Sequence, residues 1–222
     1  KMWFDGVGSG DYINCGILSG FTSYTEISIS LKFAISDNTS RIISILHSGG
    51  DDIRMAVTSA GALSIGIDDG TAFDLNFGAG FNDGMPHTAS LTLNGDGLSA
   101  TVDGTTLTNG SATFNFGTGN GLCLIGSTST APGNNLAKGL IYDVEISNQS
   151  GLTHTWLGNG NTDAAWEDTI GSNDGTVNGS PVTVGQKRET ILQTAGEDFN
   201  KRMWFGVSGR VAIPTASTRP FQ

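Results

Sequence analysis

Segment 25–35, TEISISLKFAI, is the most restrictive pattern in this chain of 222 residues, because apolar and polar residues alternate along its whole length. The apolar positions are Ile27, Ile29, Leu31, Phe33 and Ile35. Successive side chains of a β-strand point to opposite faces of the sheet. A period of two therefore predicts a strand with one buried face and one polar face.

Shorter segments with the same character follow at regular intervals. They lie at 41–47, 53–57, 63–67, 87–94 and 139–147. Turn-forming pairs such as Asp103-Gly104 separate them, and the chain holds 33 glycines, which adopt turn conformations at little cost. Many short strands joined by tight turns predict an all-β fold, an antiparallel two-sheet β-sandwich of the jelly-roll kind.

The strand pattern weakens near residue 150, where Gly, Asn, Asp and Thr become frequent. We therefore expect a jelly-roll domain over 1–150 and a loop-rich C-terminal extension over 151–222. The extension repeats the N-terminal motif, since Met2-Trp3-Phe4 returns as Met203-Trp204-Phe205. Two interpretations stay open: the remnant of a second module, or an extra strand pair that docks on a sheet edge of its own or a neighbouring chain. We favour docking.

The charge of the chain argues against two classes of partner. The formal net charge is −10 and only 11 residues are Lys or Arg, too few and too scattered for a phosphate-binding groove. No apolar run reaches the length of a membrane span, so we expect neither nucleic acid binding nor membrane insertion. Whether the two cysteines, Cys15 and Cys123, pair is left open by the sequence.

A series of short motifs follows one order along the chain. They are Phe4-Asp5-Gly6, Gly10-Asp11-Tyr12-Ile13, Asp83-Gly84 with His87, Ala89, Leu91 and Leu93, then Val102-Asp103-Gly104, and finally Gly139, Ile141, Asp143-Val144 and Ile146. In this order they resemble the laminin G-like jelly rolls of the concanavalin A-like lectin/glucanase superfamily. One departure is the Trp that usually follows the Asp-Gly turn, where this chain has Pro86.

A second resemblance concerns the stretch from Trp156 to Pro181, which is similar to segments that follow such jelly rolls in tailed-phage virion proteins. It implies a non-enzymatic structural or receptor-contacting module, a tail fibre or capsid decoration, located in the virion. Its partners would be other virion proteins or copies of itself. The alternative is an extracellular carbohydrate-binding module of a secreted bacterial protein or adhesin, with cell-surface glycan as its partner.

Catalysis is not expected, although the superfamily includes glucanases. Retaining glycoside hydrolysis needs a paired nucleophile and acid, which the glucanase relatives present as E-x-D-x-E on one strand. The best match here is Asp143-Val144-Glu145, which lacks the third acid. The three histidines show no spacing typical of a zinc site.

Two kinds of binding residue are candidates. Calcium prefers oxygen ligands, which Asp51-Asp52 and Asp68-Asp69 could supply, although such residues in turns usually bond to the backbone instead. Exposed aromatic rings stack on sugars, and Tyr24, Trp156 and Trp166 lie in loop-like sequence. The two tryptophans have an alternative role, which is to anchor the tail onto the sandwich.

Overall fold

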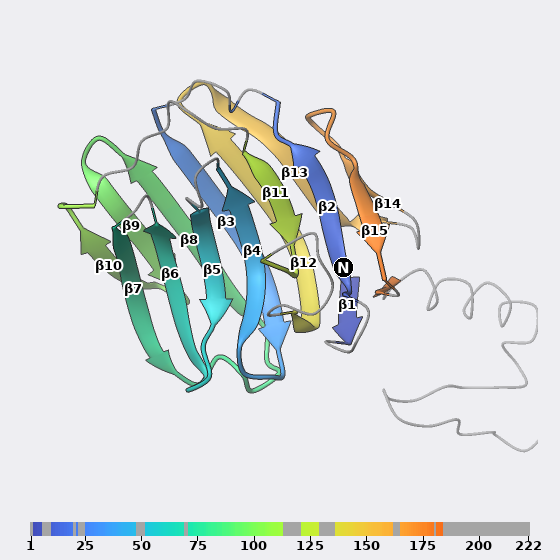
Figure 1. The fold of residues 1–222 in the computed structure, drawn as a ribbon, viewed down its shortest axis with the longest axis horizontal. Coiled ribbons are helices and arrows are strands. Elements are labelled where there is room, and N and C mark those ends of the chain that lie inside the picture. Colours follow the sequence, from blue (N-terminus) through green and yellow to red (C-terminus); the bar gives the residue numbers. More distant parts are fainter. Residues whose placement is uncertain are drawn as a thin grey trace, which may run out of the picture. The chain divides into compact units, whose positions relative to one another are not determined.

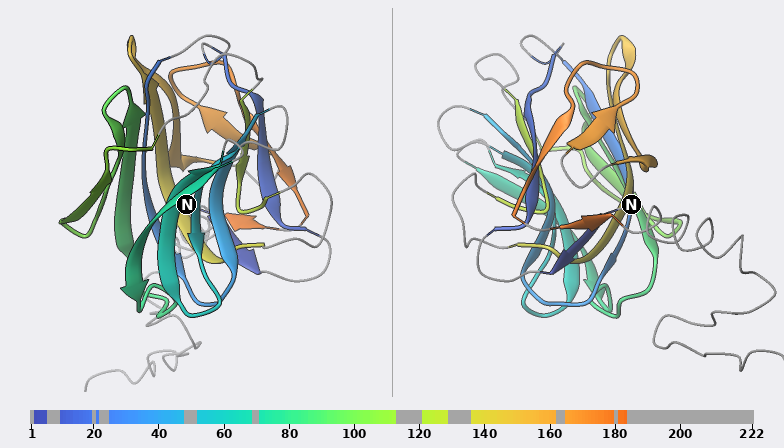
Figure 2. Two further views of the ribbon diagram at one scale, coloured as in Figure 1. Left: turned by 60° about the vertical axis from the view of Figure 1, so that its left-hand side comes forward. Right: turned by 90° about the vertical axis from the view of Figure 1, so that its right-hand side faces the viewer.

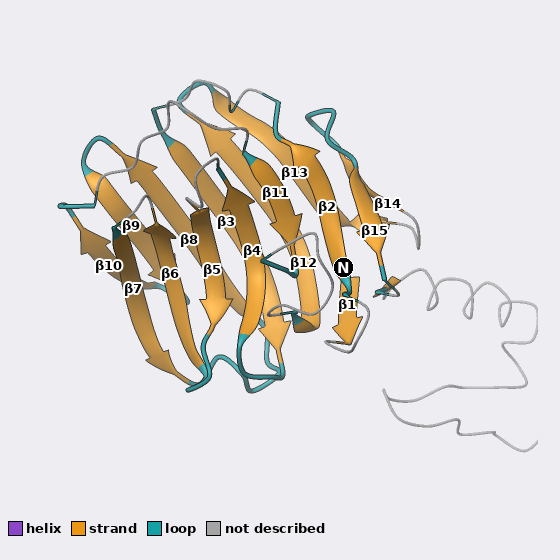
Figure 3. Cartoon of the chain, viewed as in Figure 1, coloured by secondary structure: helices purple, strands orange, loops and turns teal. Residues whose placement is uncertain are grey.

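Every element in the described part of the chain is a strand in the computed structural model (Figure 3). The structure describes residues 2–5, 10–19, 21, 25–47, 52–68, 71–112, 121–128, 136–161, 165–179 and 181–183, with the backbone alone at residues 5, 152, 159–161, 182 and 183. The strands are β1 (Met2–Asp5), β2 (Tyr12–Ile17), β3 (Ile27–Ile35), β4 (Ser40–Leu46), β5 (Asp52–Val57), β6 (Ala62–Asp68), β7 (Ala72–Ala79), β8 (His87–Asn94), β9 (Gly97–Val102), β10 (Thr105–Asn109), β11 (Leu122–Ile125), β12 (Lys138–Asn148), β13 (Gly151–Asn161), β14 (Ala165–Asp168), β15 (Gly175–Asn178) and β16 (Val182–Thr183).

The strands build two facing layers that are joined along one side (Figures 1 and 2). The first layer has the order β10-β9-β8-β3-β12, and the second has the order β2-β11-β4-β5-β6-β7. Strands β13, β14 and β15 connect β12 to β2, and we call them the junction. All these pairings are antiparallel, so the predicted fold class, an antiparallel two-sheet β-sandwich, is confirmed.

The core forms where the inward faces of the two layers meet. Strand β3 follows its sequence pattern, because its five alternating apolar residues are all buried while Ser28, Ser30 and Lys32 point outward. The opposite layer contributes Ile43, Ile45 and similar side chains to the same cluster. Full burial of one such side chain contributes about 1.5–3 kcal/mol, so the alternation in sequence is the main source of stability.

Residues 151–183, where the sequence suggests loops, form four strands instead. Strand β13 pairs with β12, β14 pairs with β13, and β15 pairs with both β14 and β2. Lys1–Thr183 accordingly group into one compact unit, separate from Val184–Gln222. Trp156 and Trp166, both fully buried, anchor this stretch in the hydrophobic core. The repeated motif at 203–205 lies outside the described residues.

Strand β1 fills a gap beside β12. The second half of β12 pairs with β13, whereas its first half, Lys138–Ile141, pairs with β1. Met2 and Phe4 of β1 are fully buried, and Trp3 between them is 37% exposed. Strand β16 pairs with the other side of β1.

The two cysteines lie on the adjacent strands β2 and β11, where both are buried free thiols. Burial, together with a hydrogen bond from the neighbouring thiol, raises the pKa of Cys15 well above its usual value. Across the described residues, no helix has the length and apolar character that crossing a bilayer requires.

Candidate functional site

The outward face of the first layer carries short polar side chains in rows that cross its strands. One row consists of Glu145, Ser30, Ser90, Thr101 and Thr106, each directly opposite the next in the strand register. These residues are the polar partners of the alternating apolar residues that build the core. The same alternation that folds the sandwich therefore lines its outer face with hydroxyl groups.

A second row runs parallel to the first. It contains Ser147, Ser28, Thr92 and Ser99, again opposite one another. The hydroxyls of Ser28 and Thr92 are hydrogen bonded at 2.9 Å. Cross-strand pairs of this kind contribute to sheet stability. They also fix the positions of the hydroxyl groups on this face.

A β-bulge interrupts β12 beside the two rows. Between Ile141 and Val144 two residues of β12, Tyr142 and Asp143, face a single residue of β3, Lys32. Bulges re-aim side chains and are frequent near functional sites. Asp143 and Glu145 are two residues apart and share the outer face, and the extra residue of the bulge lets Ile141 stay buried on the other face. The ammonium group of Lys32 lies 5.2 Å from the centre of the Tyr142 ring.

These groups surround a hollow of about 310 Å³. Its lining residues are Ser30, Leu31, Lys32, Thr88, Ala89, Ser90, Thr101, Asp103, Asp143 and Glu145. A smaller hollow of about 110 Å³ shares Ser30, Ser90 and Glu145 with it. We refer to the larger one as the outer-face hollow. Its hydroxyls both donate and accept hydrogen bonds, its carboxylates accept and Lys32 donates, which suits a ligand rich in hydroxyl groups.

Two of the carboxylates in the hollow are held by neighbours. The backbone N–H of Gly158 donates to Asp143 at 2.6 Å, and the hydroxyl of Ser30 donates to Glu145 at 3.4 Å. The contacts of these two carboxylates thus come from the neighbouring strands β13 and β3. Both side chains keep further acceptor capacity, because a carboxylate has about four lone-pair sites.

The third carboxylate, Asp103, belongs to a histidine network at the rim. It accepts hydrogen bonds from the backbone N–H and hydroxyl of Thr88, and it contacts His87 Nδ1 at 2.6 Å. The other ring nitrogen of His87 contacts Asp83 at 3.2 Å. Partial burial lowers the pKa of His87, but the hydrogen bonds to Asp103 and Asp83 outweigh it and raise that pKa overall. Desolvation raises the pKa of Asp103, but the hydrogen bonds with Thr88 and His87 outweigh it and lower that pKa overall.

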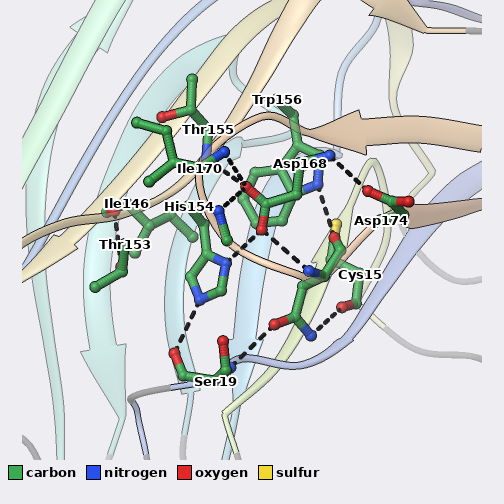
Figure 4. A network of polar contacts seen from close by, with 12 residues as sticks. Cys15, Ser19, Ile146, Thr153, His154, Thr155, Trp156, Asp168, Ile170 and Asp174 are labelled. Atoms are coloured by element: carbon green, nitrogen blue, oxygen red, sulfur yellow. Dashed lines mark hydrogen bonds and ion pairs between the residues drawn. The ribbon is translucent and has the colours of Figure 1, made fainter.

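A second histidine–aspartate pair lies in the junction and is fully buried (Figure 4). His154 Nδ1 contacts Asp168 at 2.6 Å, and His154 Nε2 contacts the carbonyl oxygen of Ser19 at 2.9 Å. Both ring nitrogens therefore face acceptors. The network ties β13 to β14 and to the segment after β2.

Asp168 is the centre of this network. Besides His154, the backbone N–H groups of Thr155, Ile170, Gly171 and Asn173 donate to its carboxylate. Burial alone would raise the pKa of Asp168, but these donors lower it below its usual value. The carboxylate therefore holds the turn after β14 in place, because backbone N–H groups of that turn donate to it.

The tryptophans expected to stack on sugars are part of the same buried junction. Trp156 and Trp166 are both 0% exposed. Their indole N–H groups donate to the carbonyl oxygens of Asn173 at 3.0 Å and Leu157 at 2.7 Å, and Trp156 stacks on His154. Neither ring can reach a ligand, so they anchor the junction instead. The third candidate, Tyr24, lies outside the described residues.

The expected calcium ligands are engaged by arginine. Asp52 pairs with Arg54 at 2.5 Å and with Arg41 at 3.5 Å, and Asp68 lies 4.0 Å from Arg54. Asp52 and Asp68 are opposite each other on β5 and β6, but a guanidinium group occupies the position where a cation would neutralise them. These residues do not fit a calcium site. Asp51 and Asp69 lie outside the described residues, and within the described part no cluster of three or more His, Cys, Asp or Glu could hold a metal ion.

The hollow was not predicted from the sequence, where Asp143 and Glu145 were considered only as catalytic residues. The missed residues are Ser30, Lys32, Thr88, Ser90, Thr101 and Asp103. Their signal was present as the polar positions of the alternating segments. A period of two identifies an outward face, but it does not show which outward face is hollowed.

Comparisons with known proteins bear on the fold alone. No family model matches the chain, and no curated protein matches its sequence. Solved structures do match. A candidate carbohydrate binding protein from Bacteroides ovatus aligns at 12% identity with a TM-score of 0.55, over 80% of this chain and 59% of that one.

Two further solved structures have the same architecture. The LG1-3 region of the laminin alpha2 chain aligns at 14% identity and a TM-score of 0.53, over 81% of this chain and 34% of that one. A pentraxin from Limulus polyphemus aligns at 14% identity and a TM-score of 0.50, over 65% and 74%. The chain thus spans only part of the length of the laminin and Bacteroides proteins. The described sandwich has a jelly-roll fold like that of these laminin G and pentraxin structures.

Proposed function

We propose that the outer-face hollow binds a neutral oligosaccharide and that the protein is a non-enzymatic carbohydrate-binding module. The observation that carries the proposal is the row of Glu145, Ser30, Ser90 and Thr101 across four strands, opening into one hollow. Binding sites for polar ligands place a few oriented polar groups in a concave surface. The strand register provides that orientation here.

The charge of the hollow favours a neutral ligand. Three carboxylates, Asp103, Asp143 and Glu145, line it together with one cation, Lys32. An anionic sugar would meet repulsion from these carboxylates, and the net charge of −10 would oppose its approach. Sugar hydroxyls can instead donate to the carboxylates and accept from Lys32.

Binding without cleavage is supported by the state of the carboxylates. A general acid in glycoside hydrolysis needs a raised pKa, whereas the pKa of Asp103 is lowered. Asp143 accepts a hydrogen bond from the Gly158 N–H, which stabilises its ionised form rather than the protonated form of a general acid. The sequence also lacks the third acid of the glucanase pattern. A structural relative from Bacteroides ovatus described as a candidate carbohydrate binding protein agrees with binding as the role of such a sandwich.

A glycan array with the full chain tests this proposal. We expect binding to neutral oligosaccharides and weaker binding to those with uronic or sialic acid. Glu145→Gln and Asp143→Asn should each weaken binding several-fold, and neither variant nor the wild type should release reducing sugar. Binding confined to acidic glycans, or sugar release that Glu145→Gln abolishes, would contradict the proposal.

A virion setting is a second proposal, compatible with the first. It is supported by the similarity of the Trp156–Pro181 stretch to segments of tailed-phage virion proteins, and a glycan-binding face would suit receptor contact. An extracellular setting in a secreted protein or adhesin is the alternative. Genes for capsid or tail proteins beside the gene for this chain would favour the virion. Genes for secretion or cell-wall attachment would favour the alternative.

A further inference from the structure

The slot that holds β1 is built for two apolar side chains in alternation. Met2 and Phe4 enter the core with no exposed surface, while Trp3 faces outward. The ring of Phe4 lies so close to Gly126 that a Cβ there would be 2.9 Å from it. Phe4 lies directly opposite Gly139 in the register. The slot therefore accepts an apolar–x–Phe strand, and Gly126 leaves room for the aromatic ring.

The chain contains this strand twice. Met203-Trp204-Phe205 repeats Met2-Trp3-Phe4 letter for letter, and a basic residue precedes each copy. After the Phe, the copies also share Gly6-Val7 with Gly206-Val207 and Ser9-Gly10 with Ser208-Gly209, whereas Asp11-Tyr12 has no counterpart. The strand that fills the β1 slot is thus the longest uninterrupted match between the two copies. Residues 203–205 are outside the described residues.

The last described strand, β16, lies beside the β1 slot. Thr183 lies opposite Met2, so the described chain leaves the sandwich beside β1. Residues 184–202 then separate Thr183 from the second copy. Fully extended, they reach roughly 60 Å, which is more than the diameter of a domain of this size. The copy can therefore reach a neighbouring molecule.

We propose that Met203–Phe205 of one chain enters the β1 slot of a second copy of this chain, in a reciprocal strand exchange. In its own chain the slot is filled by β1, which a short connection, residues 6–11, holds to β2. A short tether outcompetes a long one within a chain. Between two chains, exchange replaces each β1 by a strand of the same sequence, so the contacts within each slot are kept, and a rising protein concentration favours the exchanged pair over the single chains.

Cysteine cross-linking in the full chain tests the exchange. Trp3 lies opposite Leu140 in the register, and both side chains face outward. In an exchanged pair, residue 204 takes the place of Trp3. One chain therefore carries Leu140→Cys, and a second carries Trp204→Cys. The two are mixed at high concentration in a glutathione redox buffer.

We expect a disulfide-linked dimer that joins positions 140 and 204, with a yield that rises with concentration. Gln193→Cys in place of Trp204→Cys is the matched control and should give several-fold less. Phe205→Ala should reduce the dimer, whereas Phe4→Ala should increase it by weakening the resident strand. Phe4→Leu is used to weaken the resident strand if the Phe4→Ala protein does not fold.

Trp3→Cys with Leu140→Cys in one chain is the positive control for the register. A dimer yield equal to that of the Gln193→Cys control would overturn the proposal. So would a cross-link that forms only within single chains when Leu140→Cys and Trp204→Cys are combined.

Discussion

The junction and the outer-face hollow use opposite kinds of side chain. The junction holds Trp156, Trp166, His154 and Asp168, all of them buried. The hollow is lined by serines, threonines, three carboxylates and one lysine. Tryptophan, histidine and aspartate, which are frequent in binding sites, thus stabilise the junction. Serine and threonine form much of the candidate site. Chemical type alone does not identify a site; exposure and shape do.

Two histidine–aspartate pairs show how the junction and the hollow differ in burial. His154–Asp168 in the junction and His87–Asp103 beside the hollow both have contacts of 2.6 Å. The side chains of the first pair are 0% exposed, whereas that of Asp103 is 45% exposed. A buried charge that loses its partner costs far more than an exposed one. The same contact should therefore have very different weight in the two regions.

The largest effect is expected for Asp168→Asn. The substitution removes the charge opposite His154 and disturbs four backbone donors, so the free energy of unfolding should fall by about 3–5 kcal/mol. Urea denaturation followed by tryptophan fluorescence measures it. The matched variant Asp103→Asn should cost less than about 1 kcal/mol. An equal fall in the free energy of unfolding for the two variants would contradict the different weight expected for the buried and the exposed pair.

A smaller effect is expected for Trp156→Phe. An aromatic ring is retained, but the indole N–H that donates to the part-buried carbonyl oxygen of Asn173 is lost. The loss of stability should be about 1–3 kcal/mol. Glycan affinity at a temperature where the variant is folded should not change. Lost affinity in a folded Trp156→Phe protein would show that the junction, not the hollow, contacts the ligand.

The acid limb of stability should depend on Asp168. Its pKa is lowered in the folded state, so its contribution is present above the unfolded value of about 3.9 and is lost as the pH falls through the folded value. The stability difference between wild type and Asp168→Asn should therefore shrink below about pH 4. A difference that stays constant down to the acid transition would be inconsistent with this assignment.

The smallest effect is expected at His87, whose pKa is raised. Its contribution is complete below the unfolded value of about 6.5 and is lost as the pH rises through the higher folded value. Titration of the ring protons by NMR should place that midpoint above about 6.5. His87→Gln should flatten the slope of stability above neutral pH, by less than about 1 kcal/mol. A midpoint below 6.5 would contradict the network.

The strands could be predicted from sequence because their pattern is local. The period of two at 25–35 places β3 and its buried face correctly. Strand β13 was missed because its sequence is mostly polar and its stability comes from pairing with β12 and from the burial of Trp156 and Trp166. The hollow depends on four strands and a bulge at Tyr142–Asp143, none of which a single segment encodes.

Binding of a neutral glycan in the outer-face hollow can be tested by filling the hollow with a large side chain. Ser90 lies in the middle of the polar row and lines both hollows, so Ser90→Tyr should block them without touching the core. Asn76→Tyr, on exposed β7 of the other layer, is the matched control. Isothermal titration with an oligosaccharide found on the array should show affinity reduced at least tenfold for Ser90→Tyr and unchanged for Asn76→Tyr. Unchanged affinity in a folded Ser90→Tyr protein would contradict the account.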